Sequence, residues 1–184
     1  MIDFASLAAS LRWVTVEVSD GGESFGSGVL WPRGCVVTNA HVARRSRTAV
    51  RLVDGRRLEG RLVARDPDAD LALLRLAGTG IPTVTVADTG APKVGSVVVA
   101  IGHPFGVRGA LTAGIVHATG PIVPGGRRWI QADLRLAPGS SGGPLADASG
   151  RVIGLNAMIV GALALAIPMS EVTQFARAAG VEGT

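Results

Sequence analysis

The chain has 184 residues, enough to bury a core in one large domain or two small ones, and its composition, 47% hydrophobic but 4% aromatic, predicts a mainly aliphatic core. The net charge of +4 includes eight arginines between Arg44 and Arg65, but no aromatic residue alternates with them, so we expect arginines on the solvent face of strands and no nucleic-acid partner. The only cysteine, Cys35, excludes an internal disulfide and a cysteine-based metal site, and its apolar context GCVVT predicts a small core residue.

The first element expected is a short amphipathic helix over residues 2–11, because apolar side chains recur there at helical spacing. The opening sequence MIDFASLAASLRW lacks the basic start and apolar segment of a signal peptide. Further on, Asp54-Gly55 stands between VRLV and RRLEG and is a strong two-residue hairpin signal. We therefore expect two paired strands around it.

Most of the remaining chain is expected to form short strands, because apolar and β-branched runs are separated by turn signals. The expected strands cover residues 13–18, 26–31, 35–38, 71–76, 83–86, 97–101, 111–116, 130–133, 152–156 and 163–167. A closing helix is expected over residues 170–179, with Ser170 as its N-cap and Gly180 at its end. So many strands with so little helix predict an all-β fold.

The stretch ADTGAPKVG, residues 87–95, is the best candidate for a linker and divides the chain near its middle. We therefore expect two small barrels, the first in residues 1–90 and the second, with the closing helix, in residues 91–184. Residues 152–170 form an uncharged run of 19 residues, which is long enough for a membrane span. Because glycine, asparagine and proline interrupt this run, we expect two buried strands there and no membrane insertion.

The loop APGSSGGPLAD, residues 137–147, has the composition either of a flexible linker or of a loop that holds a reactive serine. Its GSSGG segment fits the G-x-S-x-G pattern of α/β-hydrolases, in which the catalytic histidine follows the serine in the chain. All the histidines here, His41, His103 and His117, precede Ser141. The α/β-hydrolase interpretation is therefore excluded, and the strand-rich pattern argues against it independently.

Two further residues complete a different constellation. His41 follows the apolar run VVTNA, and Asp70 lies in RDPDAD just before an alternating strand, so both stand at strand ends. The order His41, Asp70, Ser141, with spacings of 29 and 71 residues, is the chain order of chymotrypsin-like enzymes. A serine hydroxyl needs a neighbouring base of near-neutral pKa, and that base needs a carboxylate to orient it. The three residues together therefore indicate nucleophilic catalysis.

The glycines of the loop fit this chemistry. Backbone amides of Gly139 and Ser141 would have to point into one small hole to stabilise an oxyanion, and glycine adopts the required dihedral angles at least cost. The alternative of a metal site is weaker. Asp66, Asp68 and Asp70 form a D-x-D-x-D pattern, but the glycine and glutamate of a calcium loop are missing at the positions where they would be needed. We expect neither a metal nor a cofactor.

The segments TNAHV, DADLALL and PGSSGGPL resemble the three catalytic blocks of trypsin-like serine proteases of the HtrA/DegP type. The segments GSGVL, VVVAIGHPFG and GRVIGLNAMIV agree, and the resemblance covers roughly residues 12–175. It implies two six-stranded antiparallel β-barrels with the active site between them, peptide or unfolded-protein substrates, and a location in the periplasm or cell envelope. It also implies His41 as general base, Asp70 as its orienting partner, Ser141 as nucleophile, and an oxyanion hole made by the amides of Gly139, Ser140 and Ser141.

The chain departs from the family pattern at several points. Ser140 stands where relatives usually carry asparagine, and the segment of residues 159–165 is shorter than usual. Relatives usually carry peptide-binding PDZ domains after the protease, whereas this chain ends at Thr184. Arg135 occupies a position where the family tends to have a small or apolar residue.

The resemblance also indicates where a substrate would lie. Its backbone is expected to pair with the strand Ala157-Met158-Ile159, and Ala157, Ile159 and Ala164 are candidate walls of the pocket that determines specificity. Those walls favour a small or medium apolar residue before the cleaved bond. Arg135 lies near the pocket floor by spacing, and two orientations stay open. An inward guanidinium would favour acidic residues, and an outward one would leave the apolar preference.

Two other hypotheses compete with a serine endopeptidase. The same fold could hold peptides while turnover is absent or latent, for example with a collapsed oxyanion loop. The chain could also be a protease released from a membrane-anchored or PDZ-bearing parent. The intact set of His41, Asp70 and Ser141 favours the enzyme.

Overall fold

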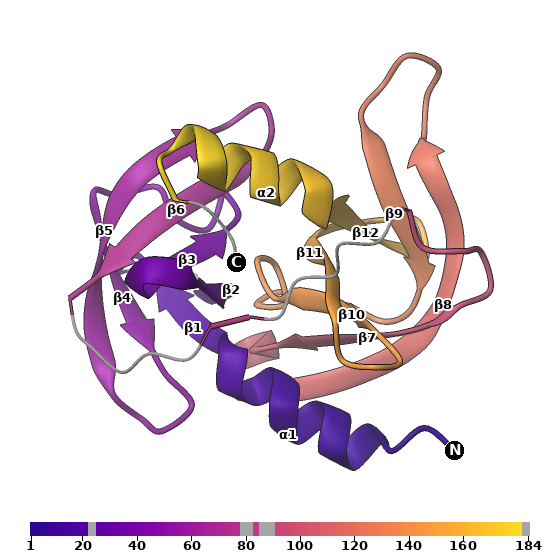
Figure 1. Ribbon diagram of the computed structural model, residues 1–184, viewed down its shortest axis with the longest axis horizontal. Coiled ribbons are helices and arrows are strands. Elements are labelled where there is room, and N and C mark those ends of the chain that lie inside the picture. The colour runs from indigo at the N-terminus through magenta and orange to yellow at the C-terminus, as the bar shows by residue number, and fades with distance from the viewer. Residues whose placement is uncertain (22–24, 78–82, 85–90, 182–184) are drawn as a thin grey trace.

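The computed structural model describes residues 1–21, 25–77, 83–84 and 91–181 (Figure 1). Within them, twelve strands form two closed antiparallel barrels of six strands each, with one helix before the first barrel and one after the second. The strand order is β1-β2-β3-β6-β5-β4 in the first barrel and β10-β11-β12-β9-β8-β7 in the second. The predicted all-β fold of two six-stranded barrels is confirmed.

The strands are mostly short and follow one another closely. The helices are α1 (Phe4–Val14) and α2 (Met169–Ala178), and single 3₁₀ turns cover Pro32–Gly34 and Pro104–Gly106. The strands of the first barrel are β1 (Thr15–Ser19), β2 (Phe25–Trp31), β3 (Cys35–Thr38), β4 (Arg47–Arg51), β5 (Arg57–Asp66) and β6 (Leu71–Leu76). Those of the second are β7 (Val97–Gly102), β8 (Ala110–Pro121), β9 (Arg128–Asp133), β10 (Pro144–Asp147), β11 (Val152–Val160) and β12 (Leu163–Pro168).

Apolar runs such as LALL in β6 arise because both faces of a strand are buried. Successive side chains point to opposite faces, so Ala72 and Leu74 fill the interior of the first barrel, whereas Leu71 and Leu73 pack outside it. The second barrel has its own interior cluster, which includes Val98 from β7. The described residues therefore form three buried apolar clusters, one inside each barrel and one between the barrels.

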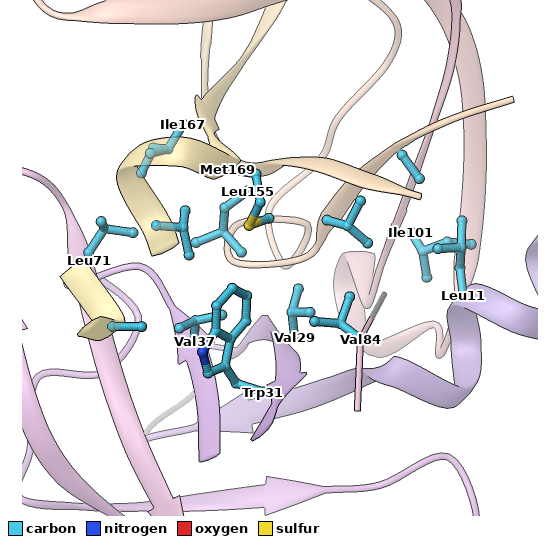
Figure 2. Close-up of a cluster of buried hydrophobic side chains, with 14 of the residues drawn as sticks. Leu11, Val29, Trp31, Val37, Leu71, Val84, Ile101, Leu155, Ile167 and Met169 are labelled. Carbon is cyan, nitrogen blue, oxygen red and sulfur yellow. The ribbon is translucent and has the colours of Figure 1, made fainter. Parts of the chain in front are cut away.

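The cluster between the barrels joins elements from the whole chain (Figure 2). The first barrel contributes Val29 and Trp31, and the second contributes Leu155. Leu11 of α1 and Met169 of α2 pack into the same cluster, so both helices cover the interface. Because the barrels pack together here, the ends of β2, β3 and β6 in the first barrel have a fixed position relative to the β9–β10 loop of the second.

Several local predictions are corrected. The first helix covers Phe4–Val14 rather than residues 2–11, because the Asp3 carboxylate caps it by accepting from the amides of Ala5 and Ser6. The second begins at Met169, and its N-cap position is Pro168, which has no side-chain cap. The prediction of Ser170 as N-cap is therefore wrong, whereas Gly180 ends the helix at a φ of 79° as expected.

Within the uncharged run of residues 152–170, residues 152–160 and 163–168 form β11 and β12 as predicted, and α2 begins at Met169. The expectation that both strands are buried holds only in part, because residues 158–160 at the end of β11 are exposed. No helix within the described part of the chain is long and apolar enough to cross a membrane. Residues 83–84 are not in a strand, and residues 85–86 of the same predicted strand lie outside the described residues. The sequence signals do not predict strand β10, because Pro144–Asp147 lies at the end of the glycine-rich segment.

The predicted linker, residues 87–95, lies partly outside the described residues, which resume at residue 91. The first barrel ends with β6 at Leu76 and the second begins with β7 at Val97. We keep the division into residues 1–90 and 91–184 as a proposal.

Candidate active site

His41 lies in a tight turn directly after β3. The Asn39 carbonyl accepts from the amides of Val42 and Ala43, both at 3.1 Å, so the chain turns back at once. The guanidinium of Arg65 donates to the carbonyl of Ala40 through Nε at 3.1 Å and Nη2 at 3.0 Å. These bonds fix the backbone that carries the imidazole.

Asp70 lies just before β6 and faces His41. Its carboxylate accepts from the His41 backbone amide at 3.0 Å, and the ring Nδ1 lies 3.0 Å from Oδ1 and 2.9 Å from Oδ2. The backbone of Asp70 is left-handed, with φ at 51°, and its carbonyl accepts from the side-chain amide of Asn39. One carboxylate thus fixes both the backbone and the ring of the histidine, with Nδ1 towards the carboxylate and Nε2 outside this contact.

The two neighbouring aspartates have other roles. Asp66 Oδ1 accepts from the amides of Asp68 and Ala69, which holds the turn before β6. Asp68 is exposed. Of the three acids, Asp70 is therefore the one whose carboxylate contacts the imidazole of His41.

Ser141 lies in the loop between β9 and β10, whose shape depends on glycine. Gly139 has a φ of 103°, and a side chain there would overlap the carbonyl oxygen of His103. Gly142 has a φ of 83°, and its amide donates to the Asn156 carbonyl at 2.8 Å. Both positions require glycine, because the backbone conformation and the close packing each exclude a side chain.

Ser140 is buried, and its amide donates to the carbonyl of Ala137 at 2.9 Å. That amide is therefore engaged within the loop, which does not support its predicted place in an oxyanion hole. The amides of Gly139 and Ser141 donate to no acceptor within the described residues.

Ser27 of the first barrel holds the loop by hydrogen bonds, a role that the sequence did not predict. The Ser27 amide donates to the Ser141 carbonyl at 2.7 Å, and its hydroxyl donates to the Gly139 carbonyl at 2.8 Å. Thr38, at the end of the strand that leads to His41, donates to the Ser27 carbonyl at 2.6 Å. A small polar residue inside the buried segment GSGVL was the only sequence signal for this role.

His103, whose role the sequence also did not predict, adds further hydrogen bonds that hold this loop. Its ring is buried, with Nδ1 3.1 Å from the Ser27 hydroxyl, and its amide donates to that hydroxyl and to the Gly139 carbonyl. Burial, and to a lesser degree the charges of Arg108 and Arg51, lowers the pKa of His103 to about 4. The imidazole is therefore neutral at pH 7.

The hydroxyl of Ser141 donates to the Ala157 carbonyl at 3.0 Å, and no hydrogen bond joins it to His41 in the described structure. The pairing of β11 with β12 shifts register between Asn156 and Met158, so Ala157 is an extra residue in a bulge. The bulge turns the Ala157 carbonyl towards the loop that carries Ser141.

The predicted specificity residues are only partly brought together. Ile159 and Ala164 are cross-strand partners on β11 and β12. Ala157 packs in the cluster between the barrels, whereas Ala164 packs inside the second barrel, so the two alanines do not form one wall. Arg135 is exposed in the segment after β9, and Met158 is also exposed. Among the residues described, no group of three histidine, cysteine, aspartate or glutamate side chains could hold a metal.

Comparison with known proteins gives one family and several relatives. The family described as trypsin-like peptidase domain matches residues 26–155. A probable periplasmic serine endoprotease DegP-like of Ectopseudomonas mendocina is 40% identical over 171 residues, which cover 88% of this chain and 36% of the relative. Proteins of the same description from Pseudomonas putida and Halomonas elongata are 43% and 40% identical over 74% and 77% of this chain. The chain spans about a third of the length of these relatives.

Proposed function

The chain belongs to the trypsin-like peptidase domain family, and from that premise we propose that it is a serine endopeptidase that hydrolyses peptide bonds of protein substrates. The observation that carries the proposal is the contact of both Asp70 carboxylate oxygens with Nδ1 of His41, three residues after Thr38, against which the loop that carries Ser141 packs. Such a pair is what an unactivated serine hydroxyl requires.

In the proposed reaction, Nε2 of His41 takes the proton of the Ser141 hydroxyl as its oxygen attacks the substrate carbonyl. The carboxylate of Asp70 stabilises the imidazolium that results. His41 then gives the proton to the leaving amine, and an acyl-enzyme on Ser141 remains. Water, deprotonated by His41, hydrolyses the acyl-enzyme and restores the serine.

The oxyanion formed in each step needs backbone donors. The amides of Gly139 and Ser141 suit this role, because they flank the nucleophile and donate to no other acceptor in the described structure. The bonds from Ser27 and His103 to the Gly139 carbonyl hold that peptide unit in place. The hole we propose is therefore made of two amides, without that of Ser140.

Substrate binding is proposed to complete the triad. Strand β10 pairs with β11 only as far as Leu155, so residues 157–160 keep an edge at which an extended peptide can add as a strand. An amide of that peptide would compete for the Ala157 carbonyl, which now accepts from the Ser141 hydroxyl. Once displaced, the hydroxyl can rotate towards Nε2 of His41. Extended peptides and unfolded proteins are the substrates that this edge favours.

The bond from Ser141 to Ala157 also favours a second candidate, a peptide-binding domain of the same fold in which turnover is latent. In that state the hydroxyl stays with the carbonyl and the serine is not activated. The two functions differ in one property, the reactivity of Ser141.

A fluorophosphonate probe tests the proposal, because it labels an activated serine without knowledge of the substrate. We expect labelling and casein cleavage by the wild type, loss of both in Ser141→Ala, and retention of most activity in Ser140→Ala. Ser140 is the matched control, because it is the adjacent serine of the same loop. Label found on Ser140, or undiminished cleavage by Ser141→Ala, would show that the wrong serine is assigned. A wild type that binds peptide but takes no label would favour the latent domain.

A further inference from the structure

A cavity of about 260 Å³ lies between the two barrels and helix α1, and none of its lining residues belongs to the proposed triad. Its walls come from α1 and β1 (Arg12, Thr15), from the end of β4 onward (Leu52, Val53) and from the segment after β7 (His103, Arg108, Gly109). Figure 1 shows α1, β1 and β7 meeting on this side of the molecule. The volume suits a ligand smaller than a typical drug.

The cavity carries positive charge, and none of the described residues that line it is an acid. Arg12 uses Nε to bind the Gly109 carbonyl at 2.7 Å, which leaves its two terminal nitrogens for another partner. Arg108 makes no hydrogen bond or ion pair with any described residue. Two guanidinium groups without an acid between them favour an anion, and a carboxylate matches their geometry.

His103 adds a specific polar requirement. The Ser27 hydroxyl has one proton, which it donates to the Gly139 carbonyl, so its contact with the ring is a bond from Nδ1–H of His103. The neutral ring then presents Nε2 as an acceptor. This nitrogen has no partner among the described residues, and the residue, 6% exposed overall, lines the cavity. A donor on a ligand in the cavity would pair with this acceptor.

We propose that this cavity binds a small hydroxycarboxylate with a short apolar chain. Its carboxylate pairs with Arg108 and Arg12, its hydroxyl donates to Nε2 of His103, and its apolar carbons pack against Leu52 and Val53. Each part of the ligand therefore has a matching group in the cavity wall.

A ligand in the cavity is also expected to affect the loop that carries Ser141. A ligand hydroxyl on Nε2 holds His103 in the tautomer that donates to Ser27, and Ser27 binds the Gly139 carbonyl. Ligand is therefore expected to change the rate at which a fluorophosphonate labels Ser141, a consequence that rests on the proposed function.

The binding experiment uses the whole chain and amide resonances in ¹H–¹⁵N spectra. Titration with 2-hydroxyhexanoate is expected to shift the amides of Val53, His103 and Gly109 saturably, with a dissociation constant on the order of 1 mM. Hexanoate, which lacks the hydroxyl, and hexane-1,2-diol, which lacks the carboxylate, should each bind about tenfold more weakly or worse, because the first loses the bond to His103 and the second loses the ion pairs with Arg108 and Arg12. Equal binding of either compound, or no saturable shift, would overturn the proposal.

Two arginine variants complete the test. Arg108→Gln should weaken binding of 2-hydroxyhexanoate about tenfold or more, because it removes a charge that faces the carboxylate. Arg128→Gln, an exposed arginine on β9 that does not line the cavity, is the matched control and should leave binding unchanged. If both variants lose affinity equally, the effect comes from the net charge of the protein rather than from the cavity, and the proposed site is wrong.

The labelling rate separates the two proposals. If 2-hydroxyhexanoate binds but the fluorophosphonate does not label the wild type, the proposed function is wrong and the binding site stands. If the probe labels Ser141 but 2-hydroxyhexanoate does not bind, the binding site is wrong and the proposed function stands. Binding with an unchanged labelling rate would overturn the connection through His103 and Ser27.

Discussion

At the scale of single residues, Asp70 is held in an unusual backbone conformation. Left-handed φ is uncommon outside glycine and costs on the order of 1 kcal/mol or more, so surrounding bonds must maintain it. The Asn39 side chain on its carbonyl and the Pro67 carbonyl on its amide do so. The consequence is a carboxylate that reaches both the amide and the ring of His41.

We predict that Asp70→Asn lowers kcat about 10⁴-fold, because an amide in this position leaves the imidazole in the wrong tautomer. Asp68→Asn, an exposed aspartate of the same turn, should stay within a few-fold of the wild type. Steady-state cleavage of a peptide substrate measures both. Comparable losses in the two variants would mean that the turn, rather than the contact with His41, matters.

A second residue-scale prediction concerns His103 and pH. Its pKa is near 6.5 in the unfolded chain and about 4 in the folded protein, chiefly because of burial. Between these values the unfolded chain binds a proton that the folded protein does not, so stability falls as the pH falls. From pH 7 to pH 4.5 this group should cost about 2 to 3 kcal/mol of unfolding free energy.

Urea unfolding of the wild type and of His103→Gln at these two pH values checks the prediction. The neutral glutamine cannot take up the proton, so the variant should show the smaller loss on acidification. Carboxylates titrate in both proteins and cancel in the comparison. An identical pH dependence in the two proteins would contradict a buried, neutral His103.

At the scale of elements, the β9–β10 loop is positioned by both barrels. Gly142 donates to Asn156 of β11, while Ser27 of β2 binds Gly139 and Ser141. A side chain at Gly142 would overlap the Ser27 carbonyl and the Thr38 hydroxyl, and Ser27 is the residue whose hydrogen bonds hold this loop. The loop therefore depends on glycine for contact with the first barrel as well as for its dihedral angles.

We predict that Gly142→Ala abolishes fluorophosphonate labelling and destabilises the protein by roughly 3 kcal/mol, because overlap with backbone adds to the cost of a positive φ. Gly161→Ala is the matched control. That glycine also has a positive φ, of 61°, but none of the described residues lies within 4 Å of an added side chain. It should cost about 1 kcal/mol and retain labelling. Similar losses at both sites would attribute the effect to φ alone.

At the scale of the whole molecule, the two barrels share the apolar cluster between them. Trp31 from the first barrel and Leu155 from the second are fully buried in it, together with residues of both helices. Separation of the barrels would expose this cluster to water at a cost that neither barrel can recover alone. The proposed active site, which uses residues of both barrels, therefore forms only when both barrels are folded.

We predict that residues 1–90 and 91–184, expressed as separate fragments, do not fold alone. Each fragment should show poor amide dispersion in ¹H–¹⁵N spectra, and native dispersion should return when the two are mixed. The full chain should unfold in one transition followed by tryptophan fluorescence and far-ultraviolet circular dichroism. A well-dispersed spectrum from either fragment alone would show that its barrel is an independent folding unit.

The sequence by itself determined most of the strands, the all-β fold of two barrels and the three candidate catalytic residues, but not strand β10. These depend on local signals, such as the apolar runs of β3 and β6 and the glycines around Ser141. The resemblance to HtrA/DegP-type trypsin-like proteases is confirmed by the family match and by relatives about 40% identical. Local patterns suffice here because period-two burial and tight turns are encoded within a few residues of each other.

Only the tertiary structure decided how the loop is held and where the Ser141 hydroxyl points. The Ser27 hydroxyl meets a carbonyl 112 residues away, and the ring of His103 meets Ser27 across 76 residues. No periodicity or spacing encodes such contacts, because they arise only when two closed barrels pack together. The same holds for the bulge at Ala157, since the register of β11 on β12 depends on pairing between strands. The bond from the Ser141 hydroxyl to the Ala157 carbonyl was therefore beyond sequence reasoning.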